Sequence, residues 1–585
     1  MTPSSATPQQ TDRPTTMPSP GKYQSWAERF SDFKHTNLEW LRNPTPEKIR
    51  ILETGLRDGD QALETPMSLE QRLRYFNGLL KQGLVEIETG YPAASQTNRE
   101  FTRLLIEEKR IPEGVLQQVL VAGRDDLIKK TFEALKDAPP TIVHVYVPTS
   151  EAQRTVVFKQ TREQVMRHAV ESTKLVRQLA NKYDLNIMYQ FSPESFTETD
   201  PYFALAVCDA VVDAWNPKGE EKVILNLPAT VEVCDPVQYG MLIDFIRTNL
   251  KRPEQVVISV HPHNDRGTAT AAAEYALKAG AQRVEGTFGA NGERSGNLDI
   301  WQLAANRQSE GRDPHIRLDN GPEMVALYRS CTGQEVPERH PVFGSKAYVA
   351  YSGTHQNAIE KYMTYRRETL TESWTGFPYM PRDPRDVGYA LDRLIVVNAN
   401  SGKNGVLNVM KENFNLDLRV PNTLKDFGIP VLEEFAHIVQ DWCDREGTAM
   451  TPQAMWSLFS ENYIKPFGPV ELKSYTKART EGGAHSTKVH LELTIRGGRT
   501  ITVTGQGNGT LDAAVAALRE IDQTIEVREQ VAHSRRKGSD AEEVVFLAVS
   551  RDDVTTFAVG IDPDIERANM QALIAGVNRL SWSEA

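Results

Sequence analysis

The stretch VVISVHPHNDRG, residues 256–267, joins a short apolar run to two histidines that lie two positions apart. The apolar run predicts a buried strand. Side chains at positions i and i+2 of a strand point to the same side, so His261 and His263 project together where the strand meets its loop. Two such imidazoles form half of a divalent-metal site. They are equally compatible with polar side chains that are satisfied at a strand end.

The same alternation of a short apolar run and a helical segment recurs from residue 48 to about residue 308. The helix after the first run carries clear signals, because Ser68 and Gln71 have the spacing of a capping box and Gly83 follows the apolar stripe. Similar amphipathic segments follow the later runs. The predicted strands are 49–54, 85–91, 116–122, 140–148, 186–193, 222–229, 256–262 and 283–289.

Eight strands that alternate with helices are typical of a (β/α)8 TIM barrel. A doubly wound open sheet would show the same alternation. The barrel is favoured because polar candidates for catalysis follow nearly every strand, and the carboxyl ends of all barrel strands meet at one mouth. An open sheet would spread these side chains along a line. We therefore predict an α/β fold in which a TIM barrel precedes small linker subdomains and a C-terminal α+β regulatory domain.

Changes in composition and in the strand–helix pattern predict five segments along the chain. Residues 1–22 are rich in Ser, Thr, Pro and Gln, and we expect a disordered tail there. A lead-in at 23–47 precedes the barrel at 48–320, and linker subdomains at 321–430 follow it. The last segment, 431–585, contains a duplicated strand–strand–helix pattern, which suggests internal pseudo-symmetry. The two copies are 488–495, 499–505 and 510–520, and then 543–550, 554–560 and 564–579.

Composition narrows the class of protein. The 585 residues carry a net charge of −11 with a pI near 5.7, so no electrostatic attraction to nucleic acid or to acidic membranes is expected. No apolar run approaches the roughly 18 residues that span a bilayer. The four cysteines show no C-x-x-C spacing, and the N-terminal tail lacks the features of a signal or transit peptide. We expect a cytoplasmic protein with reduced thiols.

Other strand ends supply candidates to complete the histidine pair. Arg57 and Asp58, just after the first strand, can act as an oxyanion clamp and a hard oxygen ligand, or can form a salt-bridged surface turn. Asn297 ends a small-residue loop after the eighth strand, and alone it indicates only a turn. Together, Asp58, Asn297, His261 and His263 suit Mg²⁺, Mn²⁺ or Zn²⁺ with open positions for a 2-oxo acid.

These motifs resemble the 2-isopropylmalate synthase family, in the order LRDGDQA, GYPAASQTN, SPES, NLPATVE, HPHNDRGTA and NGERSGN. The family belongs to a wider group of metal-dependent acyl-CoA condensing and cleaving barrels that includes homocitrate and citramalate synthases. The resemblance continues through YSGTHQNAI (351–359), PYMPRDPRDVG (378–388) and the duplicated C-terminal domain. It implies condensation of acetyl-CoA with 2-oxoisovalerate to 2-isopropylmalate, the first committed step of leucine biosynthesis.

The resemblance also implies roles for single residues in the barrel. Asp58, His261, His263 and Asn297 match the family's metal-site positions. Arg57 matches the residue that polarises the keto oxygen, and Glu194 in SPES matches an active-site carboxylate. His144 and Thr230 match residues that line the oxo-acid pocket. Without the resemblance, Glu194 could be a turn residue before the helix near residue 200, and His144 a satisfied core histidine.

Two further implications concern residues outside the barrel. His355 and Tyr379 match residues that the family supplies from the neighbouring subunit, which implies a homodimer. A histidine can take a proton from the acetyl methyl group at neutral pH. Exposed N–H groups in the glycine loop before the helix at 510–520 suit a carboxylate, and the resemblance implies that the ligand of this regulatory site is leucine. The residues of this predicted site are Gly505, Gly507, Asn508 and Gly509.

Rival functions remain open at the level of sequence. Homocitrate or citramalate synthase would use the same metal site, although the length and the duplicated C-terminal domain favour 2-isopropylmalate synthase. A metal-dependent barrel hydrolase also uses His-x-His, but on its first strand and with further histidines and a lysine. A non-catalytic small-molecule sensor would leave the polar residues of the barrel mouth unexplained.

Overall fold

The computed structural model describes residues 22–391, 396–398, 401–419, 431–479, 487–495, 497–535 and 541–581. Nearly all of the predicted N-terminal tail lies outside these residues. The chain divides into two compact units, the first reaching Ala347 and including Asp386–Gly388, and the second containing the remainder. Among the described residues, no helix has both the length and the apolar character that a membrane span needs.

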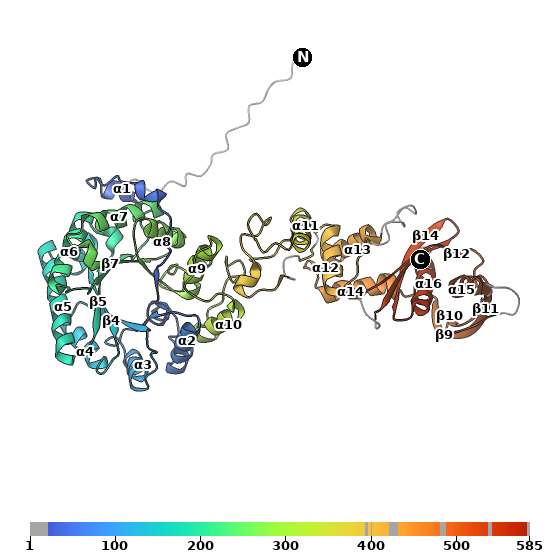
Figure 1. The fold of residues 1–585 in the computed structure, drawn as a ribbon, viewed down its shortest axis with the longest axis horizontal. Helices are drawn as coiled ribbons and strands as arrows, with labels where there is room; N and C mark the ends of the chain where they lie inside the picture. Colours follow the sequence, from blue (N-terminus) through green and yellow to red (C-terminus); the bar gives the residue numbers. More distant parts are fainter. Residues whose placement is uncertain are drawn as a thin grey trace, which may run out of the picture. The chain divides into compact units, whose positions relative to one another are not determined.

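The first unit is a closed barrel of eight parallel strands, as predicted (Figure 1). The first strand pairs with the last, with Arg50 opposite Arg283 and Glu53 opposite Gly286, and this pairing closes the ring. Every predicted strand is present within two or three residues of its predicted bounds. The strands are β1 (Arg50–Glu53), β2 (Glu86–Gly90), β3 (Leu116–Ala122), β4 (Thr141–Pro148), β5 (Ile187–Glu194), β6 (Val223–Ala229), β7 (Val256–Pro262) and β8 (Arg283–Gly286).

A layer of helices surrounds the barrel strands (Figure 1). The first of these helices begins with the predicted capping box. The Ser68 hydroxyl accepts from the Gln71 N–H, and the Gln71 side chain accepts from the Ser68 N–H. Gly83 then adopts a φ of +84°, which only glycine adopts readily. The helices are α2 (Leu69–Lys81), α3 (Gln96–Glu107), α4 (Asp125–Ala134), α5 (Arg162–Tyr183), α6 (Pro201–Trp215), α7 (Pro236–Asn249) and α8 (Ala269–Lys278).

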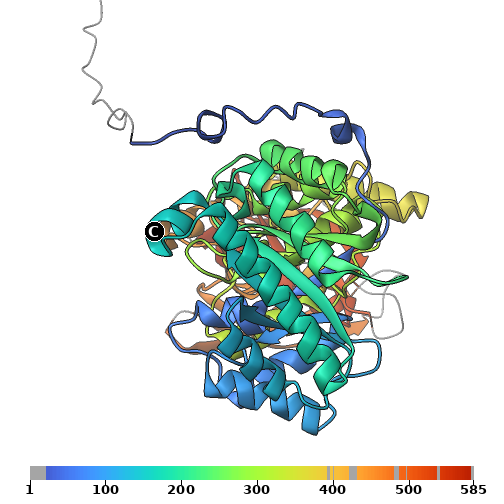
Figure 2. The same ribbon diagram turned by 90° about the vertical axis from the view of Figure 1, so that its left-hand side faces the viewer.

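The segment before the barrel packs along its outer helices (Figure 2). It contains α1 (Trp26–Arg29) and a short 3-10 turn at Glu39–Arg42. The ring of Phe33 lies edge-on to Phe245 of α7, with centroids 5.1 Å apart, and Trp40 lies edge-on to Tyr275 of α8. These aromatic contacts fix the lead-in to the barrel wall.

Further helices follow the barrel strands in the first unit and precede the C-terminal sheets in the second unit. The first unit adds α9 (Ile300–Ser309) and α10 (Gly321–Thr332), and the second unit begins with α11 (Gly353–Thr369). In the second unit, α12 (Lys403–Phe414), α13 (Val431–Glu446) and α14 (Pro452–Phe459) share one apolar core with the sheet that contains Phe546 and Val559.

The C-terminal part of the second unit consists of two modules, each with three antiparallel strands and a helix. The predicted strand–strand–helix pattern was therefore wrong by one strand in each copy. The first module contains β9 (Val470–Arg479), β10 (Thr487–Ile495), β11 (Arg499–Gly507) and α15 (Thr510–Leu518). The second contains β12 (Ile525–Ser534), β13 (Glu543–Arg551), β14 (Val554–Asp562) and α16 (Ile565–Ser581).

The two missed strands, β9 and β12, share a physical reason. Each lies at the edge of its sheet and has only one buried residue, Val470 in β9 and Ile525 in β12. The pairing register shifts beside Lys473 in β9 and beside Arg528 in β12, so each strand contains a β-bulge. A bulge interrupts the two-residue alternation by which a strand is recognised in sequence.

Candidate metal centre and active site

The predicted metal-binding side chains converge at the carboxyl ends of the barrel strands. Asp58 lies on a single turn of π-helix, Gly55–Gly59, directly after β1. His261 lies near the end of β7 and His263 just beyond it, so the pair projects from one edge. Asn297 follows β8 and forms an isolated bridge with His263. The barrel thus brings the ends of its first, seventh and eighth strands together.

The geometry of these four side chains suits a divalent cation. The ligand atoms of Asp58, His261 and His263 all lie within 4.8 Å of one another, and the three side chains are buried. Asp58 Oδ2 lies 3.3 Å from His261 Nε2 and 3.9 Å from His263 Nε2. The amide oxygen of Asn297 lies 3.0 Å from His261 Nε2. Two nitrogens, a carboxylate and an amide oxygen are ligands that Mg²⁺, Mn²⁺ and Zn²⁺ accept.

Electrostatics in the cluster favour an ionised carboxylate. Burial alone would raise the pKa of Asp58, but the guanidinium of Arg57 and the imidazole of His261 hold that pKa well below its usual value. Burial and the neighbouring His261 lower the pKa of His263 to about 4. In the absence of a cation, Asp58 and Glu285 outweigh burial and raise the pKa of His261 to about 10. Cation binding at His261 would therefore release a proton.

Arg57 is held rigidly beside this cluster. Its Nη1 donates to Asp58 Oδ1 and its Nε donates to Glu88 Oε2, each at 2.5 Å. Burial opposes the charge, yet the two carboxylates raise the pKa of Arg57 above its usual value. The guanidinium is therefore a fixed positive charge, as the developing oxyanion of a carbonyl addition requires.

A cavity of about 330 Å³ opens next to the cluster. It contains every barrel residue that was predicted for the site except Asn297, which lies behind His261 and Asp58. Its lining residues are Arg57, Asp58, Gln61, Leu120, His144, Tyr146, Ser192, Glu194, Asn226, Pro228, Thr230, His261, His263, Glu293 and Arg294.

The remaining predicted residues of the barrel occupy defined positions in this cavity. His144 is buried, with Nε2 2.7 Å from Ser192 Oγ and Nδ1 3.3 Å from Glu88 Oε1. Thr230 Oγ1 accepts from the Ser195 N–H at 2.9 Å and so connects two loops of the mouth. Burial raises the pKa of Glu194.

Several lining residues were missed in the sequence. Tyr146 lies two positions after His144 on β4, so the i, i+2 rule that paired His261 with His263 could have found it. Ser192 lies within the SPES motif itself. Asn226 is the first residue of the NLPATVE motif, whereas Leu120 carries no signal beyond its place in a strand, because an inward-facing residue in a barrel has no distinctive sequence pattern.

His355 and Tyr379 both lie in the second unit. His355 is on α11, and its ring stacks on that of Tyr379 with centroids 3.8 Å apart. Both residues are exposed. The structure therefore brings these two predicted residues together as a pair.

The predicted leucine site is more structured than a free loop. Gly505 and Gly507 belong to β11, and Asn508 and Gly509 lead into α15. The Asn508 N–H already donates to the carboxylate of Asp512 at 2.9 Å.

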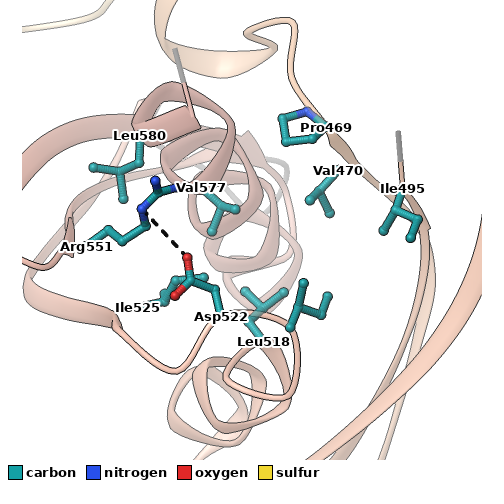
Figure 3. A pocket seen from close by; sticks show the side chains of 10 residues that line it. Pro469, Val470, Ile495, Leu518, Asp522, Ile525, Arg551, Val577 and Leu580 are labelled. Carbon is teal, nitrogen blue, oxygen red and sulfur yellow. Dashed lines mark ion pairs between the residues drawn. The ribbon is translucent and has the colours of Figure 1, made fainter. Parts of the chain in front are cut away.

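A cavity of about 210 Å³ lies elsewhere in the same unit, at the opposite end of α15 (Figure 3). It lies beside Leu518, Ile525 and Leu580, with the ion pair of Asp522 and Arg551 at one side. None of the four predicted regulatory residues is among the described residues that line it.

Comparisons with known proteins cover almost the whole chain. Residues 48–326 match the HMGL-like family, 345–411 the alpha-isopropylmalate synthase post-catalytic domain, and 449–581 the LeuA allosteric (dimerisation) domain. The 2-isopropylmalate synthase of Helicobacter hepaticus is 38% identical, over 93% of this chain and 97% of that protein. That of Ralstonia nicotianae is 40% identical over 91% of each chain, and that of Corynebacterium glutamicum strain R is 38% identical over 95% of this chain and 91% of its own length. The chain therefore belongs to the 2-isopropylmalate synthase family.

Proposed function

We propose that this protein condenses acetyl-CoA with 2-oxoisovalerate and water to form 2-isopropylmalate and CoA, the first committed step of leucine biosynthesis. The observation that carries the proposal is the side-by-side placement of Arg57 and Asp58 opposite His261 and His263 in one buried cavity. Relatives that match over nearly their full length are 2-isopropylmalate synthases, and this match does not favour the homocitrate or citramalate alternative.

The HMGL-like family is metal-dependent, and the chain has a cluster that fits a cation. Asp58, His261, His263 and Asn297 would hold Mg²⁺, Mn²⁺ or Zn²⁺. When bound, the cation supplies a Lewis acid for the carboxylate and keto oxygens of the 2-oxo acid.

Side chains around the cation site have roles in forming the new carbon–carbon bond. The acetyl methyl group loses a proton, and the resulting carbanion forms a bond to the keto carbon of 2-oxoisovalerate. The keto oxygen then becomes an alkoxide, which the fixed guanidinium of Arg57 stabilises. His144 and Thr230 line the pocket for the oxo acid, and Glu194 orients the water that cleaves the thioester and releases CoA.

His355 and Tyr379 are proposed to act on the barrel of a second copy of the chain. Their stacked and exposed rings are available for such a contact, and the C-terminal match is to a dimerisation domain. In this arrangement, His355 takes the proton from the acetyl methyl group. The functional unit would then be a homodimer in which each active site uses residues of both chains.

The match to the allosteric domain also supports inhibition by leucine, the end product of the pathway. We place the leucine site at Gly505, Gly507, Asn508 and Gly509, where β11 leads into α15.

The test is an assay of purified protein with acetyl-CoA and a panel of 2-oxo acids, in which the free thiol of CoA is measured with and without divalent metal. We expect thiol release that depends on the metal and is fastest with 2-oxoisovalerate. Faster release with 2-oxoglutarate or pyruvate would reassign the protein to the homocitrate or citramalate synthases. No release with any oxo acid would reject the condensation.

A further inference from the structure

The second ring nitrogen of His261 points away from the metal cluster, toward the interior of the barrel. There, His261 Nδ1 lies 3.1 Å from Glu285 Oε2. Glu285 lies on β8 and is fully buried. When its Nδ1–H donates to this carboxylate, the ring can offer an unprotonated Nε2 to a cation bound on the side of Asp58 and Asn297.

Glu285 is itself fixed by three donors. Its Oε1 accepts from Arg283 Nη1 at 2.6 Å, from Gln190 Nε2 at 2.7 Å and from Ser259 Oγ at 3.0 Å. Every group around this carboxylate is therefore a donor, including the Nδ1–H of His261. Only an ionised carboxylate, which accepts at both oxygens, satisfies all of them.

The two histidines of the candidate metal centre differ in the hydrogen bonding of their Nδ1 atoms. His263 Nδ1 is buried, and no hydrogen-bond partner for it is found among the described residues. The ring of His261, by contrast, has a carboxylate at its Nδ1. Orientation by a second hydrogen bond is thus built into one ligand of the pair.

We infer that Glu285 is a positioning residue of the metal centre, which sets the tautomer and the ring angle of His261. This inference rests on the metal site proposed above. Partners that receive the distal N–H of a metal-bound histidine contribute about 10- to 100-fold to metal affinity in other proteins.

Glu285→Gln makes the inference testable, because glutamine has one acceptor and one donor end. With its oxygen toward Arg283, Gln190 and Ser259, its NH₂ group would face His261 Nδ1. The ring would then have to accept at Nδ1 and carry its proton on Nε2, the atom that binds the cation.

Glu86→Gln is the matched control. Glu86 on β2 is also buried, and among the described residues its two oxygens accept from Arg50 and Arg283. The change removes the same charge next to the same arginine, without contact to His261.

The experiment measures the affinity of the chelator-treated full-length protein for Mn²⁺, together with thermal unfolding. We expect about 10- to 100-fold weaker Mn²⁺ binding for Glu285→Gln. For Glu86→Gln we expect binding within about threefold of the parent, with a comparable change in thermal midpoint. Equal affinity of Glu285→Gln and parent, or an equal loss in Glu86→Gln, would overturn the inference.

If Glu285→Gln does not fold, Glu285→Asp answers the same question. Aspartate keeps the charge for Arg283 but is too short by one methylene group to reach both partners. Weakened Mn²⁺ binding by this variant supports the inference, and parental binding rejects it. A parent protein that binds no Mn²⁺ would instead reject the metal site, and the inference with it.

Discussion

At the scale of single residues, oppositely charged side chains of the candidate active site lie side by side and hold one another in place. Arg57 is held between Asp58 and Glu88, and the ring of His261 lies between Asp58 and Glu285. Such pairs cost desolvation energy, and removal of one partner leaves an uncompensated charge. Substitutions here therefore report on chemistry only when folding is measured alongside activity.

The first prediction concerns the metal ligands. His261→Ala or His263→Ala removes one nitrogen from the cluster, so we expect weaker metal binding and lower turnover while the barrel remains folded. Metal titration, the thiol-release assay and circular dichroism measure the three quantities. Full activity of either variant in chelator-treated buffer would contradict the assignment.

The second prediction concerns Arg57. Lysine keeps the charge but loses the planar group that contacts two oxygens at once. For Arg57→Lys we expect kcat to fall at least about tenfold, or roughly 1.4 kcal/mol of transition-state stabilisation, with metal binding retained. An unchanged kcat would show that Arg57 only stabilises the turn through its ion pairs.

The third prediction concerns Glu53, which lies beneath the turn that carries Arg57. Its carboxyl accepts from the N–H groups of Gly55 and Phe288 and from the Tyr75 hydroxyl, and burial raises its pKa to about 7. Because this value lies above the unfolded value near 4.3, the protonated form stabilises the fold at low pH. That contribution is lost as the pH rises from about 4.3 through 7.

Glu53→Gln imitates the protonated form at every pH. We compare the free energy of unfolding of the variant with that of the parent at each pH. We expect the difference, variant minus parent, to be larger at pH 8 than at pH 5 by up to about 3 kcal/mol. Thermal midpoints of both proteins at the two pH values measure this difference. A difference that does not change with pH would show that Glu53 does not titrate in this range.

At the scale of elements, the barrel could be predicted because most strands are short and rich in apolar residues, and several of the helices that follow them begin with a capping residue. The bounds predicted for the strands at Leu116–Ala122 and Val256–Pro262 are those of β3 and β7. The convergence of Asp58 with the histidine pair followed from barrel geometry alone. Glu88 and Glu285 could not be found this way, since their roles depend on which side chains lie across the barrel. The bulged strands β9 and β12 lack the alternation that marks a strand.

The fourth prediction belongs to this scale. Gly505 on β11 faces Ala513 and Ala517 of α15, and Gly560 on β14 makes the equivalent close approach to α16. A Cβ at either glycine would overlap helix backbone, so Gly505→Ala or Gly560→Ala should destabilise the second unit by about 1–3 kcal/mol. Gly509→Ala is the control, because its Cβ would meet nothing within 4 Å and its φ is −156°. Equal thermal midpoints for the Gly505 and Gly509 variants would contradict the close-packing argument.

At the scale of the whole molecule, the predicted functional residues are distributed over both units. The barrel holds the candidate metal centre, while the second unit holds His355, Tyr379 and the match to an allosteric domain. In the second unit, helices α12, α13 and α14 share a core with the sheet of the last module. A truncation near residue 430 would cut through this core. Leucine control is therefore better tested in the intact chain.

The last prediction is that leucine inhibits the full-length enzyme through the β11–α15 junction. An effector changes activity only if it binds one conformational state better than another. Gly507→Ala would place a Cβ against Asp512 and the Ala513 N–H, which disturbs the start of α15 where a carboxylate would bind. We expect this variant to need at least about tenfold more leucine for half inhibition, a coupling loss of about 1.4 kcal/mol, while its rate without leucine is retained.

Gly576→Ala is the matched control, because its Cβ would instead press on Val549, in the packing between α16 and β13 of the same unit. If general loosening of the unit relieved inhibition, both variants would lose it equally. If the junction binds leucine, only Gly507→Ala loses it. Condensation rates against leucine concentration for the parent and both variants decide between these outcomes. If leucine does not inhibit the parent, it is not the effector. If Gly507→Ala is half-inhibited at the same leucine concentration as the parent, the leucine site lies elsewhere.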